Sequence, residues 1–230
     1  MVSAGAAVVV AERQPTLLVD LGGDIPAVLG TEADGPGLLD WLAAPAPPPD
    51  ALPRLEVEVS PNLAILPLGR ANGQTQRALD GSPEGQRWAE PAETLARMIA
   101  LDHRTVLVDV GYRQASVVPA LADRLLELAT RSTLVTRPCL LAVRSANAHA
   151  APDDVIVVGR QARTMRSGDV QKAIGAPVVA QLRWDAAIAR AVDVGSVASK
   201  TPRSLRALAA LSPDPTSLVP LSGSPLEQAA

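Results

Sequence analysis

The sequence predicts an α/β fold, a mostly parallel sheet with helices on both faces. Three observations support this prediction. Short apolar runs alternate along the chain with helical segments of about 10–14 residues, as in a parallel sheet built from crossover units. Two runs, TLLVD at 16–20 and TVLVDVG at 105–111, are apolar until an aspartate, as in buried strands. The chain of 230 residues is 47% hydrophobic, enough for a full core.

The elements follow in order from local patterns. Residues 1–14 are expected to form a short helix, or the tail of a longer one, before the strand at 16–20. Further strands are expected at 55–60, where strict alternation indicates an edge strand, and at 63–69, 105–111, 132–138, 154–160 and 177–183. Further helices are expected at 35–44, 91–102, 117–130, 139–150, 167–175, 185–195 and 202–211. The proline-rich segment 45–54 and the polar, Gly-rich segment 70–90 are expected to be loops.

Domain organisation and composition narrow the class of protein. We expect one α/β domain over residues 1–211 and a Pro/Ser-rich, disordered tail over 212–230. The net charge of −3 and the pI of about 5.4 argue against a global field that recruits DNA or anionic lipid. A single cysteine, Cys139, fits the reducing cytoplasm. No apolar run reaches the roughly 18–20 residues of a membrane span.

Two acidic residues stand at predicted strand ends. Asp20 and Asp109 each follow a buried strand, and the carboxyl ends of parallel strands are where ligands bind in such sheets. Mg²⁺ takes one or two carboxylates together with waters and phosphate oxygens, so the pair could hold Mg²⁺ and a phosphate. The alternative is that each acid simply caps the helix that follows it.

The order of several segments resembles the ParA/MinD family of P-loop ATPases, especially the actinobacterial septum-site and pilus-assembly members related to CpaE. The segments that carry the resemblance are TLLVDLGGDIPAVLG, LAILPLG, TVLVDVG, TLVTRPCLLAV, VIVVGR and GAPVVAQLRWDAAIARAVDVG. Each is loose alone, and their joint order and spacing are more specific. The resemblance spans about residues 1–195 and implies the P-loop NTPase fold, with ATP and Mg²⁺ as cofactors.

The resemblance assigns roles to individual residues. It implies that Asp20 is the strand-end acid of switch I, near the magnesium. It implies that Asp109 is the Walker B aspartate, which holds magnesium through water, so that both acids are catalytic and metal-binding candidates. Gly111 would begin switch II, Arg160 would take the place of the residue that reads adenine, and Asp185 belongs to the closing pattern; these three are cofactor-binding candidates.

Several positions depart from the family pattern. The second aspartate that positions the attacking water is replaced by Gly22, and Asp24 would point elsewhere unless the loop rearranges. The adenine-reading asparagine is replaced by Gly159 and Arg160. Arginine can stack on a base but cannot offer the paired donor and acceptor of an amide. Slow hydrolysis is therefore expected even in a complete site.

The largest departure is the phosphate-binding loop itself. No GxxxxGK[ST] occurs in the sequence, and the deviant form of the family is absent too. Counting back from Asp20 by one family helix reaches Met1, so the first strand and the loop are expected to be missing. Either the coding start is misassigned and a P-loop lies upstream, or the protein is a degenerate relative. We favour the first, because loss of a central strand would expose an apolar edge on both its neighbours.

The expected function is spatial organisation in chromosome partition, septum-site placement or pilus assembly. ATP would stabilise a homodimer if an upstream P-loop exists, whereas the 230 residues alone are expected to be inactive. The alternatives are a pseudo-ATPase scaffold for a pilus, secretion or division-machinery protein, and a ligase of the dethiobiotin synthetase type. Nonspecific DNA binding is disfavoured by the net acidity, and RSLRALAAL is expected to pack on the domain rather than on a membrane.

Overall fold

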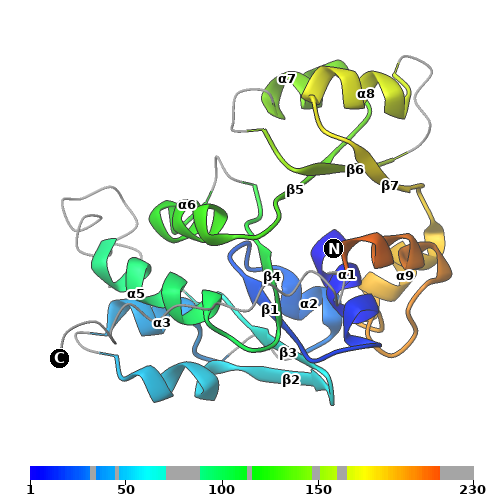
Figure 1. Cartoon of the computed structure of the whole chain (residues 1–230). Helices are drawn as coiled ribbons and strands as arrows, with labels where there is room; N and C mark the ends of the chain where they lie inside the picture. The colour runs from blue at the N-terminus through cyan, green and yellow to red at the C-terminus, as the bar shows by residue number, and fades with distance from the viewer. Residues whose placement is uncertain are drawn as a thin grey trace.

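The computed structural model describes residues 1–31, 35–44, 47–70, 89–112, 116–146, 151–159 and 165–212 (Figure 1). The strands are β1 (Thr16–Asp20), β2 (Val57–Ser60), β3 (Leu63–Leu66), β4 (Thr105–Asp109), β5 (Thr133–Thr136), β6 (Asp154–Val158) and β7 (Val178–Leu182). The α-helices are α1 (Val2–Ala11), α2 (Ile25–Leu29), α3 (Leu38–Ala43), α5 (Ala89–Ala100), α6 (Pro119–Leu128), α7 (Leu140–Ala146), α8 (Ser167–Ile174) and α9 (Ala186–Asp193). Two 3₁₀ helices are η1 (Pro49–Leu55) and η4 (Arg203–Leu211). The alternation confirms the predicted α/β class.

The first sheet has the strand order β2-β3-β1-β4. Strand β1 pairs in parallel with β3 on one side and with β4 on the other, and β2 pairs antiparallel with β3. The edge strand predicted at 55–60 is thus confirmed. All five residues of β1 are buried, because Leu18 faces one hydrophobic core while Leu17 and Val19 face another. A strand covered on both faces has no polar face, so its sequence shows no alternation.

The second sheet has the strand order β5-β6-β7, and both of its pairings are parallel. Within the part of the chain that the structure describes, no strand pairs with the outer edge of β4 or with the outer edge of β5. The predicted parallel sheet is therefore present as two pieces.

Helix α1 joins the two sheets through a common core. Every residue from Ala4 to Ala11 is buried, as expected for a helix that is apolar all round. Its side chains share one hydrophobic cluster with Leu18 of β1 and with Ile156 of β6. The two pieces of sheet are thus held together by a helix layer rather than by strand pairing. No described helix has the length and apolar character needed to cross a membrane.

The 3₁₀ helix η4 packs on α1. Leu205 and Leu208 of η4 are fully buried in the same cluster. A Cβ at Gly5 of α1 would lie 3.1 Å from Leu205 and 3.2 Å from Leu208, so glycine lets the two helices approach closely. The expectation that RSLRALAAL packs on the domain is confirmed.

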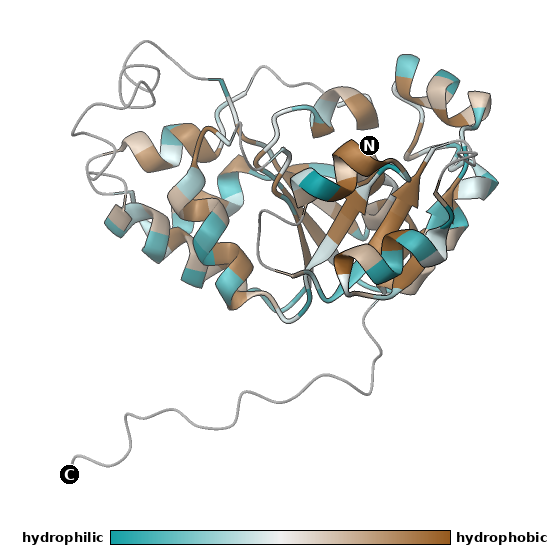
Figure 2. Ribbon diagram, turned by 90° about the horizontal axis from the view of Figure 1, so that it is seen from above, coloured by the Kyte–Doolittle hydropathy of each residue, from teal (hydrophilic) through white to brown (hydrophobic). Residues whose placement is uncertain are grey.

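Helices cover the remaining sheet faces. Trp41 of α3, Leu95 of α5 and Leu121 of α6 form a second core against the first sheet. Val143 of α7 and Val170 of α8 form a third core against the second sheet. Figure 2 shows hydrophobic strands at the centre and helices of mixed hydropathy around them. The prediction of helices on both faces is confirmed.

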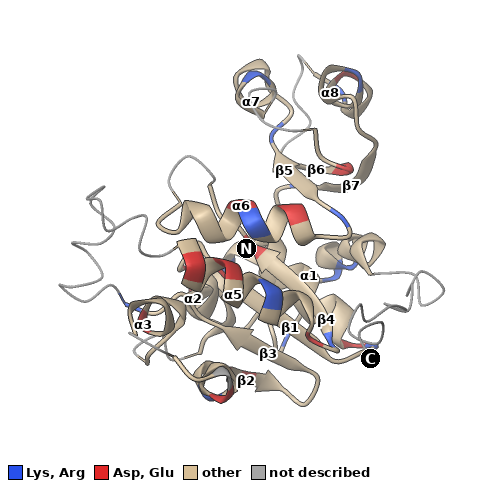
Figure 3. Cartoon of the chain, turned by 60° about the vertical axis from the view of Figure 1, so that its left-hand side comes forward, with Lys and Arg blue, Asp and Glu red and all other residues tan. Residues whose placement is uncertain are grey.

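Ion pairs fasten the outer helices to one another. Glu93 of α5 pairs with Arg97 of the same helix and with Arg124 of α6, each at 2.6 Å. Figure 3 shows the acidic and basic residues of α5 and α6 on the outside of the molecule. Exposed pairs of this kind add little stability, so the apolar cores carry the packing of these helices.

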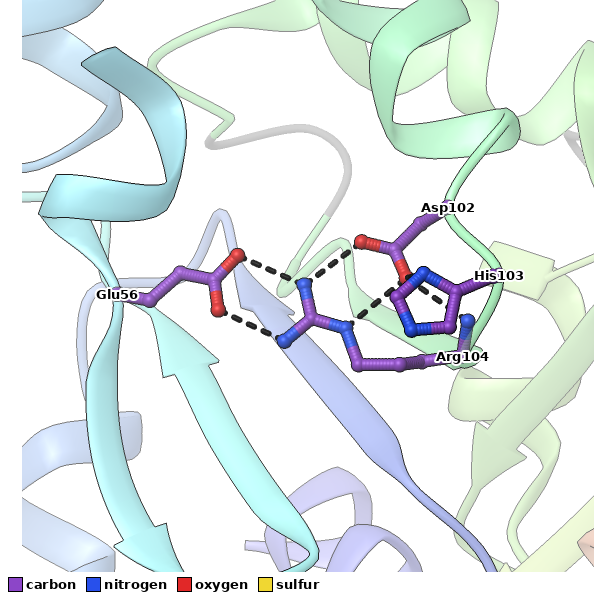
Figure 4. Close-up of polar contacts among 4 residues, drawn as sticks. All are labelled: Glu56, Asp102, His103 and Arg104. Carbon is purple, nitrogen blue, oxygen red and sulfur yellow. Dashed lines mark hydrogen bonds and ion pairs between the residues drawn. The ribbon is translucent and has the colours of Figure 1, made fainter. Parts of the chain in front are cut away.

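A partly buried ion cluster links the two outer strands of the first sheet (Figure 4). The Arg104 guanidinium, just before β4, donates to both carboxylate oxygens of Glu56, just before β2, at 2.7 Å each. The same guanidinium donates to Asp102 at 2.7 and 2.9 Å. These hydrogen bonds from Arg104 lower the pKa of the Asp102 carboxyl below its ordinary value of 3.8. Its sequence neighbour His103 is 91% exposed.

Two segments differ from the sequence-based expectations. The predicted loop at 45–54 contains η1, which begins at the third consecutive proline because proline is compatible with the first turn of a helix. Helix α2 was not predicted, although Pro26 in its first turn and Gly30 at its C-cap are the usual end signals. Residues 71–88 and 213–230, which hold most of the predicted loop 70–90 and of the tail 212–230, lie outside the described residues. The single domain predicted over 1–211 stays a prediction.

Candidate functional site

The structure brings Asp20 and Asp109 together at one edge of the first sheet. Strands β1 and β4 pair in parallel register, with Asp20 directly opposite Asp109. Each residue is the last of its strand. The two strands have the same length of five residues, and Thr16 pairs with Thr105 at their start. Their last residues, Asp20 and Asp109, are therefore also opposite each other.

The Asp20 carboxylate is buried and held by backbone amides. One oxygen accepts hydrogen bonds from Gly22 and Gly23 at 2.9 and 2.7 Å, and the other accepts from Ile25 at 3.2 Å. The residue has no solvent exposure. Burial raises the pKa of Asp20 above its ordinary value of 3.8, the three amides oppose this shift, and the charge of Asp109 adds to it. Asp20 thus shapes the turn into α2, as in the capping alternative.

The Asp109 carboxylate is less enclosed. One oxygen accepts from the backbone N–H of Gly111 at 2.8 Å, and the other accepts from the Ser3 hydroxyl at 2.5 Å. Ser3 lies in the first turn of α1, 106 residues away in sequence. Nothing in the local sequence pattern of Ser3 indicates this contact, so the sequence-based reasoning missed it.

The loops after β1 and β4 touch through two glycines. Gly111 has a φ of +67°, and a Cβ there would lie 3.1 Å from the Cα of Gly22. Glycine is therefore required at 111 by both conformation and space. A Cβ at Gly22 would lie 3.5 Å from a carboxylate oxygen of Asp24. Asp24 thus places its oxygen beside the position where a side chain at 22 would begin, rather than pointing elsewhere as expected.

The other cofactor-binding candidates lie apart from this pair. Asp185 is the N-cap of α9, where its carboxylate accepts from the amide of Ala187 at 2.8 Å and from the hydroxyl of Ser204 at 2.6 Å. The hydrogen bond from Ser204 and the one from Ala187 lower the pKa of Asp185 below its ordinary value of 3.8. These contacts give Asp185 a structural role: it caps the N-terminus of α9 and ties η4 to it through Ser204. Arg160 lies outside the described residues.

Of the two carboxylates at this sheet edge, Asp109 is the better placed to hold Mg²⁺. Asp109 is half-buried and has one hydrogen bond on each oxygen, which leaves lone pairs for a water-mediated ion. Asp20 has no exposed surface from which to reach an ion. Among the residues that the structure describes, no group of three or more His, Cys, Asp or Glu could hold a metal. An ion here would need water and phosphate as its remaining ligands.

Comparison with known proteins gives matches among solved structures. No protein-family model matches the sequence, and no curated protein matches it. A ParA family ATPase from Chlorobium tepidum TLS is 20% identical, with a TM-score of 0.71 over 91% of this chain and 90% of that one. The MinD cell division protein of Aquifex aeolicus is 17% identical, with a TM-score of 0.62 over 91% and 87%. A plasmid partition protein of Borrelia burgdorferi B31 bound to AMPPNP is 11% identical, with a TM-score of 0.63 over 91% and 89%.

The chain has the fold of ParA and MinD P-loop ATPases. The fold class expected from the resemblance, α/β with a mostly parallel sheet, is thereby confirmed. At these identities the similarity establishes the fold alone, and the roles of Asp20, Asp109, Gly111 and Asp185 stay predictions.

Proposed function

We propose that this chain is a MinD/ParA-like protein of the CpaE-related type that acts in the cytoplasm in spatial organisation. Its cargo would be a chromosome, a septum site or a pilus-assembly machine. The observation that carries the proposal is the Asp20–Asp109 pair at the carboxyl ends of two adjacent parallel strands, within a fold shared with ParA and MinD. This edge is where open α/β sheets bind their ligands.

We propose that nucleotide binding at this edge depends on a phosphate-binding loop; the 230 residues contain no GxxxxGK[ST] motif. Among the described residues, no strand pairs with the outer edges of β4 and β5. This supports the proposal that such a loop, with its strand parallel to both, would fit between the two pieces of sheet. Asp109 would then hold Mg²⁺ through water, and the ion would neutralise charge on the phosphates. Asp24, whose oxygen lies beside Gly22, would orient the attacking water in place of the second aspartate.

If a phosphate-binding loop precedes this chain, we propose that ATP binds between two protomers and stabilises a homodimer. Hydrolysis would return the protein to monomers, and a pilus, secretion or division-machinery protein would read the two states. The similarity to the MinD cell division protein and to a partition protein bound to AMPPNP supports this assignment. Without a phosphate-binding loop the chain would be catalytically inactive.

A pseudo-ATPase scaffold is the second candidate function. The observation that favours it is that both aspartates are already engaged by donors of the same chain. Asp20 accepts three backbone hydrogen bonds, and Asp109 accepts one from Gly111 and one from Ser3. An edge satisfied in this way needs no nucleotide to fold, so the surface could serve a protein partner alone.

Titration with a fluorescent ATP analogue separates these two functions. Two proteins are compared: the 230-residue chain, and the same chain preceded by a strand and a Gly-rich phosphate-binding loop taken from the genomic reading frame. The ATPase proposal expects Mg²⁺-dependent binding by the longer protein, abolished by Asp109→Ala. Asp50→Ala, which removes an exposed carboxylate in η1, is the control and should bind normally. Absence of binding by both proteins would instead favour the scaffold.

A further inference from the structure

Charge is divided unevenly between two parts of the chain. Residues 1–130 contain 17 acidic and 9 basic residues, whereas residues 131–211 contain 5 acidic and 12 basic residues. In the first part, four arginines each pair with a carboxylate: Arg54, Arg97, Arg104 and Arg124. In the second part, Arg131 alone among the described Lys and Arg residues forms an ion pair. The second part therefore carries a surplus of unpaired positive charge.

Two of these unpaired cations stand on one side of η4. Arg203 and Arg206 are exposed and lie three residues apart. A 3₁₀ helix has three residues per turn, so the two side chains lie one above the other and repel each other. Leu205 and Leu208 have the same spacing and form the buried side. An acid that contacts η4, Asp185, is engaged as the N-cap of α9. Arg203 and Arg206 thus form a basic surface on η4.

The outer side of α5 and α6 has the opposite charge. Four carboxylates form this acidic surface: Glu90 and Glu93 of α5, and Asp123 and Glu127 of α6. Within each helix they are three or four residues apart, so they are neighbours on the helix surface. Two arginines on the same helices, Arg97 and Arg124, pair with Glu93. The four acids against two bases leave the surface with an excess of negative charge.

The two charged surfaces lie on opposite faces of the first sheet. Helix η4 packs into the core that contains Leu18 of β1, whereas α5 and α6 pack into the core that contains Leu17 and Val19. Figure 1 shows α5 and α6 at the left of the molecule and the orange η4 at the right. Because the sheet separates them, the opposite charges cannot neutralise each other within one molecule.

We propose that the basic surface of η4 docks on the acidic surface of α5 and α6 of a second copy of this chain. Charge complementarity identifies the occupant, because every copy presents both halves of the contact. A head-to-tail contact of this kind leaves one surface free at each end, so association continues from copy to copy. The contact shares no residue with the Asp20–Asp109 edge and needs no nucleotide, so the inference does not rest on the proposed function.

Sedimentation velocity of the 230-residue chain without nucleotide tests the proposal. At about 20 mM NaCl the sedimentation coefficient should rise with protein concentration, and at about 500 mM NaCl it should stay at the monomer value, because salt screens exposed charges. A monomer at both salt concentrations would overturn the proposal. Association that persists unchanged at the higher salt would do the same, since apolar contacts would then be responsible.

Charge reversal locates the contact. Arg203→Glu combined with Arg206→Glu should keep the protein monomeric at low salt, and so should Glu90→Arg combined with Glu127→Arg. All four positions are exposed, so both proteins should fold like the native chain, which circular dichroism checks. Concentration-dependent sedimentation by either folded variant alone at low salt would contradict this assignment of the surfaces.

A mixture of the two reversed proteins provides the sharpest test. Each protein has two surfaces of like sign, but each surface of one complements a surface of the other. An equimolar mixture should therefore regain the sedimentation behaviour of the native chain at low salt, and failure to regain it would overturn the proposal. The control is Arg144→Glu combined with Lys172→Glu, on α7 and α8. It changes the net charge by the same amount as reversal of η4 and should associate normally.

Nucleic acid is the competing occupant of the basic surface. A fluorescently labelled duplex of about 30 base pairs is titrated with the native chain and with the η4 charge-reversal variant at low salt. The proposal expects no binding that depends on Arg203 and Arg206. Binding of the duplex by a native chain that stays monomeric, with loss of binding in the variant, would assign the surface to nucleic acid instead.

Discussion

Strands β1 and β4 have almost the same sequence, TLLVD and TVLVD, but different surroundings. All five residues of β1 are buried, whereas all five residues of β4 are half-buried. The difference follows from pairing, because β1 has a neighbour on both sides and β4 has one on the side of β1 alone among the described strands. The aspartates that end the two strands differ in the same way, since Asp20 is buried and Asp109 is half-buried. A local sequence pattern thus determines the strand, and its neighbours determine what its last residue can do.

Hydrogen exchange should give the largest contrast between the two strands. The amide of Thr105 donates to Pro15, and the carbonyl of Asp109 accepts from Leu21. In a strand, the backbone N–H groups of alternate residues point to opposite neighbouring strands. The amide of Leu107 therefore points toward β1, while the amides of Val106 and Val108 point toward the open edge.

The exchange free energy of the Leu107 amide should therefore exceed that of the Val106 and Val108 amides by at least about 3 kcal/mol. Amide exchange followed by NMR measures this difference, and the β1 amides provide the fully protected reference. Strong protection of Val106 and Val108 would mean that another strand pairs there in solution.

Alanine substitution of the two aspartates should have unequal effects on stability. Asp20→Ala leaves three amides without their acceptor, including the buried amide of Ile25. It should lower the free energy of unfolding by about 3 kcal/mol. Asp109→Ala removes a less enclosed carboxylate and should cost about 1 kcal/mol. Urea denaturation of both variants measures the difference, and equal losses would contradict the assignment of Asp20 as the structural member of the pair.

Arg104 fastens the start of β4, which has a single neighbouring strand among the described residues. Arg104→Gln would leave Glu56 and Asp102, each 16% exposed, facing one another without a cation. We expect a loss of about 2 kcal/mol in the free energy of unfolding, below the 3–5 kcal/mol typical of a fully buried pair. His103→Gln, at an exposed neighbouring position, should change stability by less than about 0.5 kcal/mol. Similar denaturation midpoints for the two variants would exclude a stabilising role for the cluster.

Titration of Asp20 should make a smaller contribution, visible in how the free energy of unfolding changes with pH. Its pKa is raised in the folded state, so the folded protein holds a proton more readily than the unfolded chain just above pH 3.8. This contribution to stability is present below the unfolded pKa and is lost as the pH rises through the folded pKa. The slope from this group is at most about 1.4 kcal/mol per pH unit.

Asp20→Asn should remove that slope, while its amide oxygen can still accept from Gly22 and Gly23. Denaturation at pH steps between about 4 and 7 measures both proteins under the same conditions. Parallel stability curves for the native chain and the variant would show that Asp20 has the same pKa in both states.

Strand-level features could be predicted from the sequence because they are local. The runs that end at Asp20 and Asp109 specify both the strands and their shared edge, and parallel pairing then places the two acids opposite each other. Contacts between distant segments could not be predicted in this way. Ser3 meets Asp109 across 106 residues, and Arg104 meets Glu56 across 48. Such contacts depend on how complete layers pack, and hydroxyl or charged residues in these positions carry no periodic signal.

The loop between β1 and α2 illustrates the same limit at short range. The spacing of Asp24 suggested that its side chain would point away from Gly22, yet its oxygen lies beside that residue. The reason is the turn imposed by Asp20, whose carboxylate accepts hydrogen bonds from the backbone amides of Gly22, Gly23 and Ile25. Side-chain to backbone hydrogen bonds of this kind redirect a loop in ways that residue spacing does not encode.

The contact between α1 and η4 has a consequence for synthesis of the chain. Leu205 and Leu208 lie against Gly5, so helix α1 is packed by a segment that leaves the ribosome much later than α1 itself. Until then, a helix that is apolar on every side lacks part of its cover. Bringing together segments this far apart in sequence is slow compared with local folding. We therefore expect nascent chains to depend on chaperones that bind apolar segments until residue 211 has emerged.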